Sequence, residues 1–128
     1  MRLSAKDAVE VASKLRYTHN GLIPVVVQDA TTKDVLMVAF ANREAVKNSL
    51  TRGRMHFWSR GRRKLWEKGE TSGHFQYLRE LDVDCDEDVL VAKVEQVVGA
   101  CHKGYRSCFF RKVNGSKLVN LGVRKWKT

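Results

Sequence analysis

The apolar residues of this chain come in short segments that polar turns interrupt, and this pattern limits the folds open to it. The longest uninterrupted apolar run is Val35 to Ala41, which suits one strand and is too short to cross a bilayer. Between 74 and 83, apolar and mostly polar side chains alternate, as in a half-buried strand. Asn114-Gly115 between two apolar segments is a strong hairpin signal. We predict strands over 25–27, 35–40, 55–59, 74–83, 89–98, 108–113 and 117–121.

Two segments predict helices. Ser4 and Asp7 have the spacing of a helix N-cap, and residues 4–16 carry a partial apolar face. Asn42 can cap a second, short helix that ends at Gly53. We therefore predict an α+β, strand-rich fold, with a mainly antiparallel sheet or barrel-like core and a few short helices.

Composition narrows the class of protein and the kind of partner. The chain has 128 residues and one proline, so we expect a single domain over 1–128. The formal net charge of +10 predicts an anionic partner, either nucleic acid or a phosphorylated metabolite. The N-terminus lacks the apolar core of a signal peptide, and three cysteines are an odd number for a disulfide framework. We therefore expect a cytoplasmic protein that does not contact a membrane.

Six of the 14 acidic residues lie between 80 and 88, where Asp84, Asp86 and Asp88 alternate with other residues. If this stretch is a strand, the three aspartates project to one face and Cys85 to the other. Carboxylates on one face repel one another unless a cation or basic groups neutralise them, and hard oxygen ligands suit Mg²⁺ or Ca²⁺. The alternative is an exposed acidic turn between two strands.

The cysteines at 85, 101 and 108 do not have the short paired spacings of a structural zinc finger. Three thiolates with one open coordination position instead match a catalytic zinc, which activates a bound water at neutral pH. The alternative is that the cysteines pack as small buried hydrophobic residues. Glycine, histidine and arginine surround Cys101 and Cys108, which favours a site. His102 is a candidate for proton transfer, for a fourth zinc ligand or for a surface residue.

Basic and aromatic residues alternate between 58 and 73, and the overlapping segment 52–68 holds seven basic residues and one acid. Guanidinium groups and Ser or Thr hydroxyls bind phosphate oxygens, and glycine lets backbone N–H groups approach them. Two interpretations compete: a groove for nucleic acid, or a pocket for a small phosphorylated nucleotide. The segment has no P-loop motif.

These segments together resemble the phosphoribosyl-AMP cyclohydrolase family of histidine biosynthesis. The resemblance covers roughly residues 20–112 and rests on several motifs in the family's order. The matching stretches are GLIP (21–24), VLM (35–37), WSR (58–60), LWEKGETSGH (65–74), VDCDED (83–88) and GACHKGYRSC (99–108). Gly61 stands where the family often has Ser, and Val98 where Gly is usual. The basic tail 124–127 lies outside the resemblance, and we assign it no function.

The resemblance implies a hydrolase that opens the adenine ring of 1-(5-phosphoribosyl)-AMP between N1 and C6. A zinc-activated water would attack C6, as in zinc nucleobase deaminases. The family holds zinc with the residues at Cys85, Cys101 and Cys108. It holds magnesium with those at Asp84, Asp86 and Asp88.

The resemblance also implies an intertwined homodimer, in which one chain gives the first cysteine of each zinc site and its partner gives the other two. His102 falls on the family's proton-transfer group. The residues that we expect to bind the substrate are Trp58, Ser59, Arg60, Lys68, Thr71, Ser72, His74 and Arg106.

Two functions from other classes stay open as alternatives. A basic zinc-binding module for RNA or single-stranded DNA would bind with a steep dependence on salt, although the acidic cluster beside the first cysteine would repel a phosphate backbone. A purine deaminase would release ammonia, but the H-x-E…P-C-x-x-C signature of those enzymes is absent. We therefore predict a single phosphorylated nucleotide as the substrate and no nucleic-acid partner.

Overall fold

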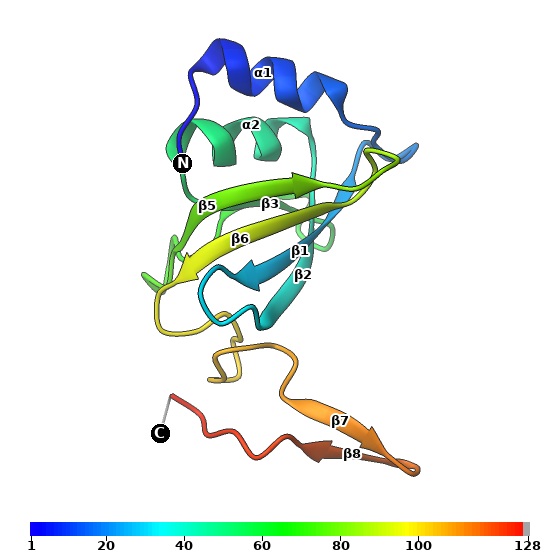
Figure 1. Ribbon diagram of the computed structural model, residues 1–128, viewed down its shortest axis with the longest axis vertical. Coiled ribbons are helices and arrows are strands. Elements are labelled where there is room, and N and C mark those ends of the chain that lie inside the picture. Colours follow the sequence, from blue (N-terminus) through cyan, green and yellow to red (C-terminus); the bar gives the residue numbers. More distant parts are fainter. Residues whose placement is uncertain (127–128) are drawn as a thin grey trace.

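Two helices lie on one side of a four-stranded sheet, and two separate hairpins complete the fold (Figure 1). The computed structural model describes residues 1–126. The elements are α1 (Ala5–Lys14), β1 (Ile23–Asp29), β2 (Val35–Ala41), α2 (Arg43–Arg52), β3 (His56–Ser59), β4 (Lys64–Glu67), β5 (Gln76–Val83), β6 (Leu90–Gln96), β7 (Arg111–Asn114) and β8 (Lys117–Asn120). In the sheet order β2-β1-β6-β5, β1 and β6 run parallel and the other neighbours antiparallel.

Both predicted helices are confirmed, and their caps explain where they begin and end. Ser4 Oγ accepts a hydrogen bond from the backbone N–H of Asp7 at 3.1 Å, and Asn42 Oδ1 accepts one from Ala45 at 2.8 Å. These bonds satisfy N–H groups that have no partner within the helix. Gly53 ends α2 with a φ of 72°, a left-handed conformation that glycine adopts without strain from a Cβ atom.

The hydrophobic core joins the two helices to the central strands. Every second residue of β1 is buried, so Ile23, Val25 and Val27 belong to one cluster with the buried alanines of α1, Ala8 and Ala12. Each aliphatic side chain of this size contributes about 1.5–3 kcal/mol when fully buried. The parallel neighbour β6 shows the same alternation of buried residues. The core therefore fixes the strand that precedes the loop 99–108.

Each predicted strand is confirmed to within a few residues, but one strand was missed. β4 lies in the basic segment 60–73, whose glycines and charges are typical of a loop, and it pairs antiparallel with β3. The buried ring of Phe57 lies 5.3 Å from the ring of Trp66. This contact between the two strands supplies apolar packing that the pattern of β4 alone does not show.

The expected mainly antiparallel α+β fold is confirmed, whereas the barrel-like core is wrong. Within residues 1–126 the sheet stays open, with β2 and β5 as its two edges. The four remaining strands form two separate hairpins, β3–β4 and β7–β8. The helices cover one face of the open sheet (Figure 1).

The C-terminal hairpin β7–β8 forms as predicted, with a tight turn at Gly115 whose φ is 64°. It extends away from the sheet (Figure 1), and its side chains Val113 and Leu118 are 74% and 62% exposed. After β8 the chain turns back, and the backbone N–H of Trp126 donates to Gly104 O at 2.8 Å. Of the tail 124–127, only its last residue, Lys127, lies outside the described residues.

Candidate active site

The loop 99–108 follows β6 and carries two of the predicted metal ligands. The backbone N–H of Cys101 donates to Tyr105 O at 3.1 Å, and that of Gly104 donates to Cys101 O at 3.0 Å. Gly104 has a φ of 95°, a conformation that suits glycine at the tip of the loop. These bonds hold Cys101, which is buried, in a defined position.

Cys101 and Cys108 meet where this loop ends, beside Lys68. The backbone N–H of Cys108 donates to Leu36 O at 2.7 Å, which ties the second cysteine to β2. Burial raises the pKa of the Cys108 thiol, as does the neighbouring Cys101, while Lys68 acts in the opposite direction. Burial lowers the pKa of Lys68 although both thiols oppose the shift, and its Nζ donates to Ala100 O at 2.6 Å. The cluster offers two soft sulfur ligands beside a cation that counterbalances thiolate charge.

Cys85 does not join this pair within one chain. It lies in the turn before β6, whereas Cys101 follows β6, so the two are at opposite ends of the sheet (Figure 1). A strand of this length spans about 20 Å. One chain therefore brings together two of the three predicted zinc ligands.

The acidic stretch 84–88 is a turn between β5 and β6, so the predicted strand alternation is wrong here. The chain leaves β5 at Val83, and Glu87 adopts a φ of 59°. One ligand atom from each of Asp84, Cys85 and Asp86 lies within 4.8 Å of the other two. Cys85 thus lies with the aspartates and not on the opposite face. The stretch is an exposed turn, and the cation site at its carboxylates stays a prediction.

Asp84 organises this turn. Its Oδ1 accepts the backbone N–H groups of Asp88 at 2.9 Å and Val89 at 3.2 Å. Partial desolvation acts to raise the pKa of Asp84, but hydrogen bonds from Asp88 and Val89 hold it below its usual range. The side-chain hydrogen bond to Asp84 raises the pKa of Asp88. A cation held by both carboxyl groups would favour their ionised forms.

Of the two candidate histidines, His102 lies in the loop 99–108 and His74 follows β4. His102 is exposed and directly follows the buried Cys101. His74 is half-buried, and its backbone N–H donates to Ser72 Oγ at 3.1 Å. The centre of its ring lies 4.7 Å from that of the Trp126 ring, with the two planes nearly perpendicular. His102 is therefore the more exposed of the two, and it is next in sequence to a cysteine of the pair.

The residues expected to bind the substrate form two groups at opposite ends of the β3–β4 hairpin. In the first group, Trp58 and Arg60 border a hollow of about 400 Å³ next to Asn42, and the Arg60 guanidinium lies 4.0 Å from the centre of the Phe40 ring. This first group is Trp58, Ser59 and Arg60. The second group follows β4, on the side of the cysteine pair, and consists of Lys68, Thr71, Ser72 and His74.

Arg106, the remaining residue of that set, links the loop to β1. Its guanidinium lies 2.6 Å from the Asp29 carboxylate and donates to Val98 O at 3.1 Å. Burial acts to raise the pKa of Asp29, but hydrogen bonds from the backbone of Thr31 and Thr32 and from Arg106 lower it. Asp29 is therefore ionised near neutral pH and anchors Arg106, whose contact with substrate stays a prediction.

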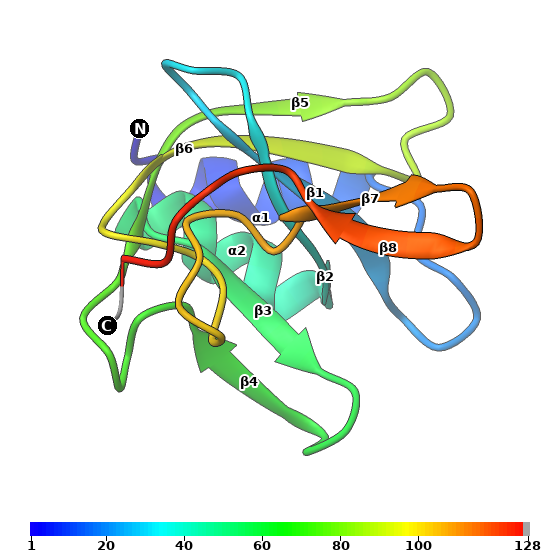
Figure 2. The ribbon, with the colours of Figure 1, turned by 90° about the horizontal axis from the view of Figure 1, so that it is seen from below.

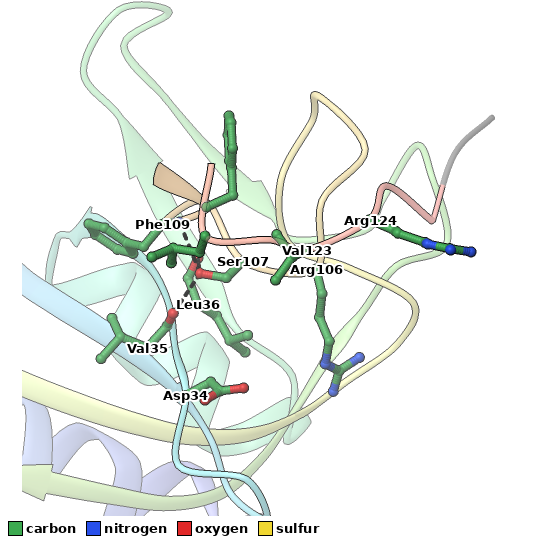
Figure 3. Close-up of a pocket in the computed structure, with 10 residues that line it drawn as sticks. Asp34, Val35, Leu36, Arg106, Ser107, Phe109, Val123 and Arg124 are labelled. Atoms are coloured by element: carbon green, nitrogen blue, oxygen red, sulfur yellow. Dashed lines mark hydrogen bonds between the residues drawn. The ribbon is translucent and has the colours of Figure 1, made fainter. Parts of the chain in front are cut away.

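A cavity of about 400 Å³ lies beside the second cysteine, between the start of β2 and the returning C-terminal segment (Figure 3). Ser107 forms part of its wall, and its Oγ donates to Val35 O at 2.6 Å. Sequence reasoning missed the apolar residues that complete the lining, Phe109, Phe110, Leu121 and Val123. The sequence offered one signal for this lining: the apolar positions 121 and 123, two residues apart beyond the hairpin.

Comparison with known proteins identifies the family. The family model for phosphoribosyl-AMP cyclohydrolase matches residues 37–110. A phosphoribosyl-AMP cyclohydrolase of Methanospirillum hungatei is 50% identical over 111 residues, which cover 87% of this chain and 85% of the relative. The one of Methanosarcina mazei is 56% identical over 101 residues, 79% and 83% of the two chains. This chain belongs to the phosphoribosyl-AMP cyclohydrolase family.

The resemblance noted from the motifs is thereby confirmed. A third relative has a longer chain: the histidine biosynthesis bifunctional protein HisIE of Thermoanaerobacter pseudethanolicus is 49% identical over 108 residues, which cover 84% of this chain and 50% of the relative. The part that the cyclohydrolase model matches contains the cysteine pair, the acidic turn and both candidate histidines. It excludes α1, β1 and everything after residue 110. Among residues 1–126, no helix has the length and apolar character needed to cross a membrane.

Val98, where the resemblance noted from the motifs implies glycine, is held in a conformation that suits glycine. Its φ is 56° and its side chain is 45% exposed. Since left-handed backbone is costly for a β-branched residue, we expect Val98→Gly to raise the free energy of unfolding by about 1 kcal/mol. Urea denaturation of both proteins measures the difference. The neighbouring half-buried Val97, whose φ is not positive, is the control, and Val97→Gly is expected to destabilise. A loss of stability in Val98→Gly would contradict the assignment of strain.

Proposed function

We propose that the chain is a hydrolase of histidine biosynthesis that opens the adenine ring of 1-(5-phosphoribosyl)-AMP between N1 and C6. Membership of the family and the names of the relatives support this substrate and pathway. The observation that carries the proposal is the Cys101–Cys108 pair beside Lys68, with His102 exposed next to it. This arrangement joins metal ligands to a group that can transfer protons. The expected cytoplasmic location stays a prediction.

The proposed zinc ligands are Cys101 and Cys108 of one chain and Cys85 of a second copy. A catalytic zinc takes three protein ligands and keeps one position open, and one chain brings only two thiols together. The fit rests on the donor set: two adjacent sulfurs with a lysine beside them suit a soft, thiolate-bound cation. When bound, zinc supplies a Lewis acid and an activated water at neutral pH. The proposed assembly is therefore a homodimer.

Magnesium is proposed to bind the acidic turn through Asp84, Asp86 and Asp88. Exposed carboxylate oxygens are the ligands that Mg²⁺ prefers, and the first two already lie close together. The magnesium would offset the phosphate charge of the substrate near the turn, where the surface is otherwise acidic.

The chain's own residues supply binding and proton transfer in this proposal. The Lys68 ammonium opposes the burial that raises the pKa of the Cys108 thiol, and its hydrogen bond to Ala100 O keeps it in place. Ser72 and His74 bind the nucleotide on the same side of the site. His102 takes a proton from the attacking water and returns it to N1 as the C6–N1 bond breaks. The net reaction adds one water across that bond and releases no ammonia.

Metal analysis combined with an assay tests the proposed function. The purified full chain is expected to hold zinc at a ratio of about one per chain, and to change the absorbance of phosphoribosyl-AMP when Mg²⁺ is present. Removal of Mg²⁺ should stop turnover while zinc stays bound. A zinc-loaded protein with added Mg²⁺ that leaves the substrate unchanged would refute the proposal, and release of ammonia would indicate a deaminase instead.

A further inference from the structure

The chain beyond the C-terminal hairpin folds back onto the candidate site, as Figure 2 shows from below. We refer to residues 121–126 as the C-terminal strap. Two contacts fasten its end to the loop that holds the first cysteine of the pair. The backbone N–H of Trp126 donates to Gly104 O at 2.8 Å, and the Lys125 ammonium lies 5.6 Å from the centre of the Tyr105 ring.

The indole of Trp126 fills the space in front of Gly99. A Cβ atom on Gly99 would lie 2.4 Å from Nε1 and 2.7 Å from Cδ1 of Trp126, and 2.9 Å from Tyr105 O. Real Cβ atoms do not approach other atoms so closely, so the ring occupies the place of a side chain at 99. The need for glycine at this position is therefore steric and comes in large part from the strap.

The Trp126 ring also contacts the ring of His74. The ring centres lie 4.7 Å apart at an angle of 81°, an edge-to-face arrangement that aromatic pairs favour. His74 follows β4, whereas Gly99 follows β6. One side chain from the C-terminal strap thus bridges the two segments on which the proposed chemistry depends.

We propose that the C-terminal strap is part of the active site and that Trp126 is a positioning residue, which holds the loop 99–104 against His74. The proposal rests on the proposed function, because it concerns the same site. The strap lies beyond the residues that the family model matches, and sequence analysis assigned it no role. Through the loop, Trp126 sets the positions of Cys101 and His102. Misplacement of such groups by about 1 Å can cost roughly 100-fold in rate.

Hydrogen exchange of the full chain tests the contact without any assay of activity. In Trp126→Ala, the amides of the loop 99–106 are expected to exchange at least about tenfold faster, because their hydrogen bonds open more often. Peptides from β1 and β6 should be unchanged. Zinc should also leave this variant faster when a chelator is added. Val113→Ala, in the exposed part of the C-terminal hairpin, is the matched control and should behave as the wild type.

Kinetics test the positioning role. Trp126→Ala is expected to lower kcat/KM at least about tenfold, and Trp126→Phe, which keeps an aromatic edge beside His74, should recover part of this loss. Unchanged loop exchange, or faster exchange with unchanged kinetics, would overturn the proposal. If the wild type has no cyclohydrolase activity, the proposed function fails, while the exchange and zinc-release results still decide whether the strap holds the loop.

A second variant checks the steric argument by a different route. Gly99→Ala should displace the indole and lower kcat/KM, and combining it with Trp126→Ala should cost less than the product of the two separate losses. Some loss should persist in the double variant, since Tyr105 O also crowds a Cβ at 99. Fully multiplicative losses would show that Gly99 and Trp126 act independently, which contradicts the proposal.

Discussion

Replacement of Cys101 by serine is expected to lower kcat/KM for phosphoribosyl-AMP by at least about 10³-fold. The thiolate sulfur is the soft ligand that zinc prefers, whereas a serine hydroxyl stays protonated and binds zinc poorly. The substitution changes one atom of a small, buried side chain, so the fold should survive. The assay should be paired with zinc analysis, since activity and bound zinc are expected to fall together.

Met55→Leu is the matched control for this experiment. Met55 is buried, and its carbonyl accepts the backbone N–H of Lys68 at 3.0 Å. The variant therefore removes a sulfur close to the site without removing a proposed ligand, and swaps of similar volume are well tolerated. It should keep its zinc and most of its activity. Full activity and full zinc content in Cys101→Ser would show that this cysteine only packs in the core.

Local sequence signals predicted the local structure well. The caps at Ser4 and Asn42 and the turn at Gly115 depend on residues within a few positions of one another, and all three are found. The parallel pairing of β1 with β6 joins residues about 65 positions apart, such as Val25 and Leu90, and no local pattern encodes it. The missed strand β4 has a different cause: its partner β3 is near in sequence, but the charged, glycine-containing pattern of 60–73 does not reveal the packing of Trp66 against Phe57.

The site shows the same division. Residue types and the resemblance picked out Cys101, Cys108 and His102. The contact of Lys68 with Ala100 O and its place beside the two thiols depend on tertiary structure. The alternation argument for Cys85 failed because it assumed that the strand continues past Val83. Trp126 carried no signal at all, since one tryptophan in a basic tail does not reveal which segments it will bridge.

Mixing two inactive variants is expected to restore activity, and this follows from the separation of Cys85 from the cysteine pair. Cys85→Ser and Cys101→Ser should each be inactive alone. In a mixed dimer, one of the two sites takes Cys85 from the Cys101→Ser chain and the intact pair from the Cys85→Ser chain. Random reassociation makes half of the dimers mixed, each with one working site, so about a quarter of wild-type activity should return.

The pairing of variants gives this experiment an internal control. A mixture of Cys101→Ser and Cys108→Ser should stay inactive, because both changes fall on the part of the site that one chain supplies alone. Recovery in the first mixture and none in the second therefore requires a site shared between chains. If neither mixture recovers, Cys85 must reach the pair within its own chain, which requires the acidic turn to leave its place at the far end of β6. If both recover, the cysteines do not act together at one metal.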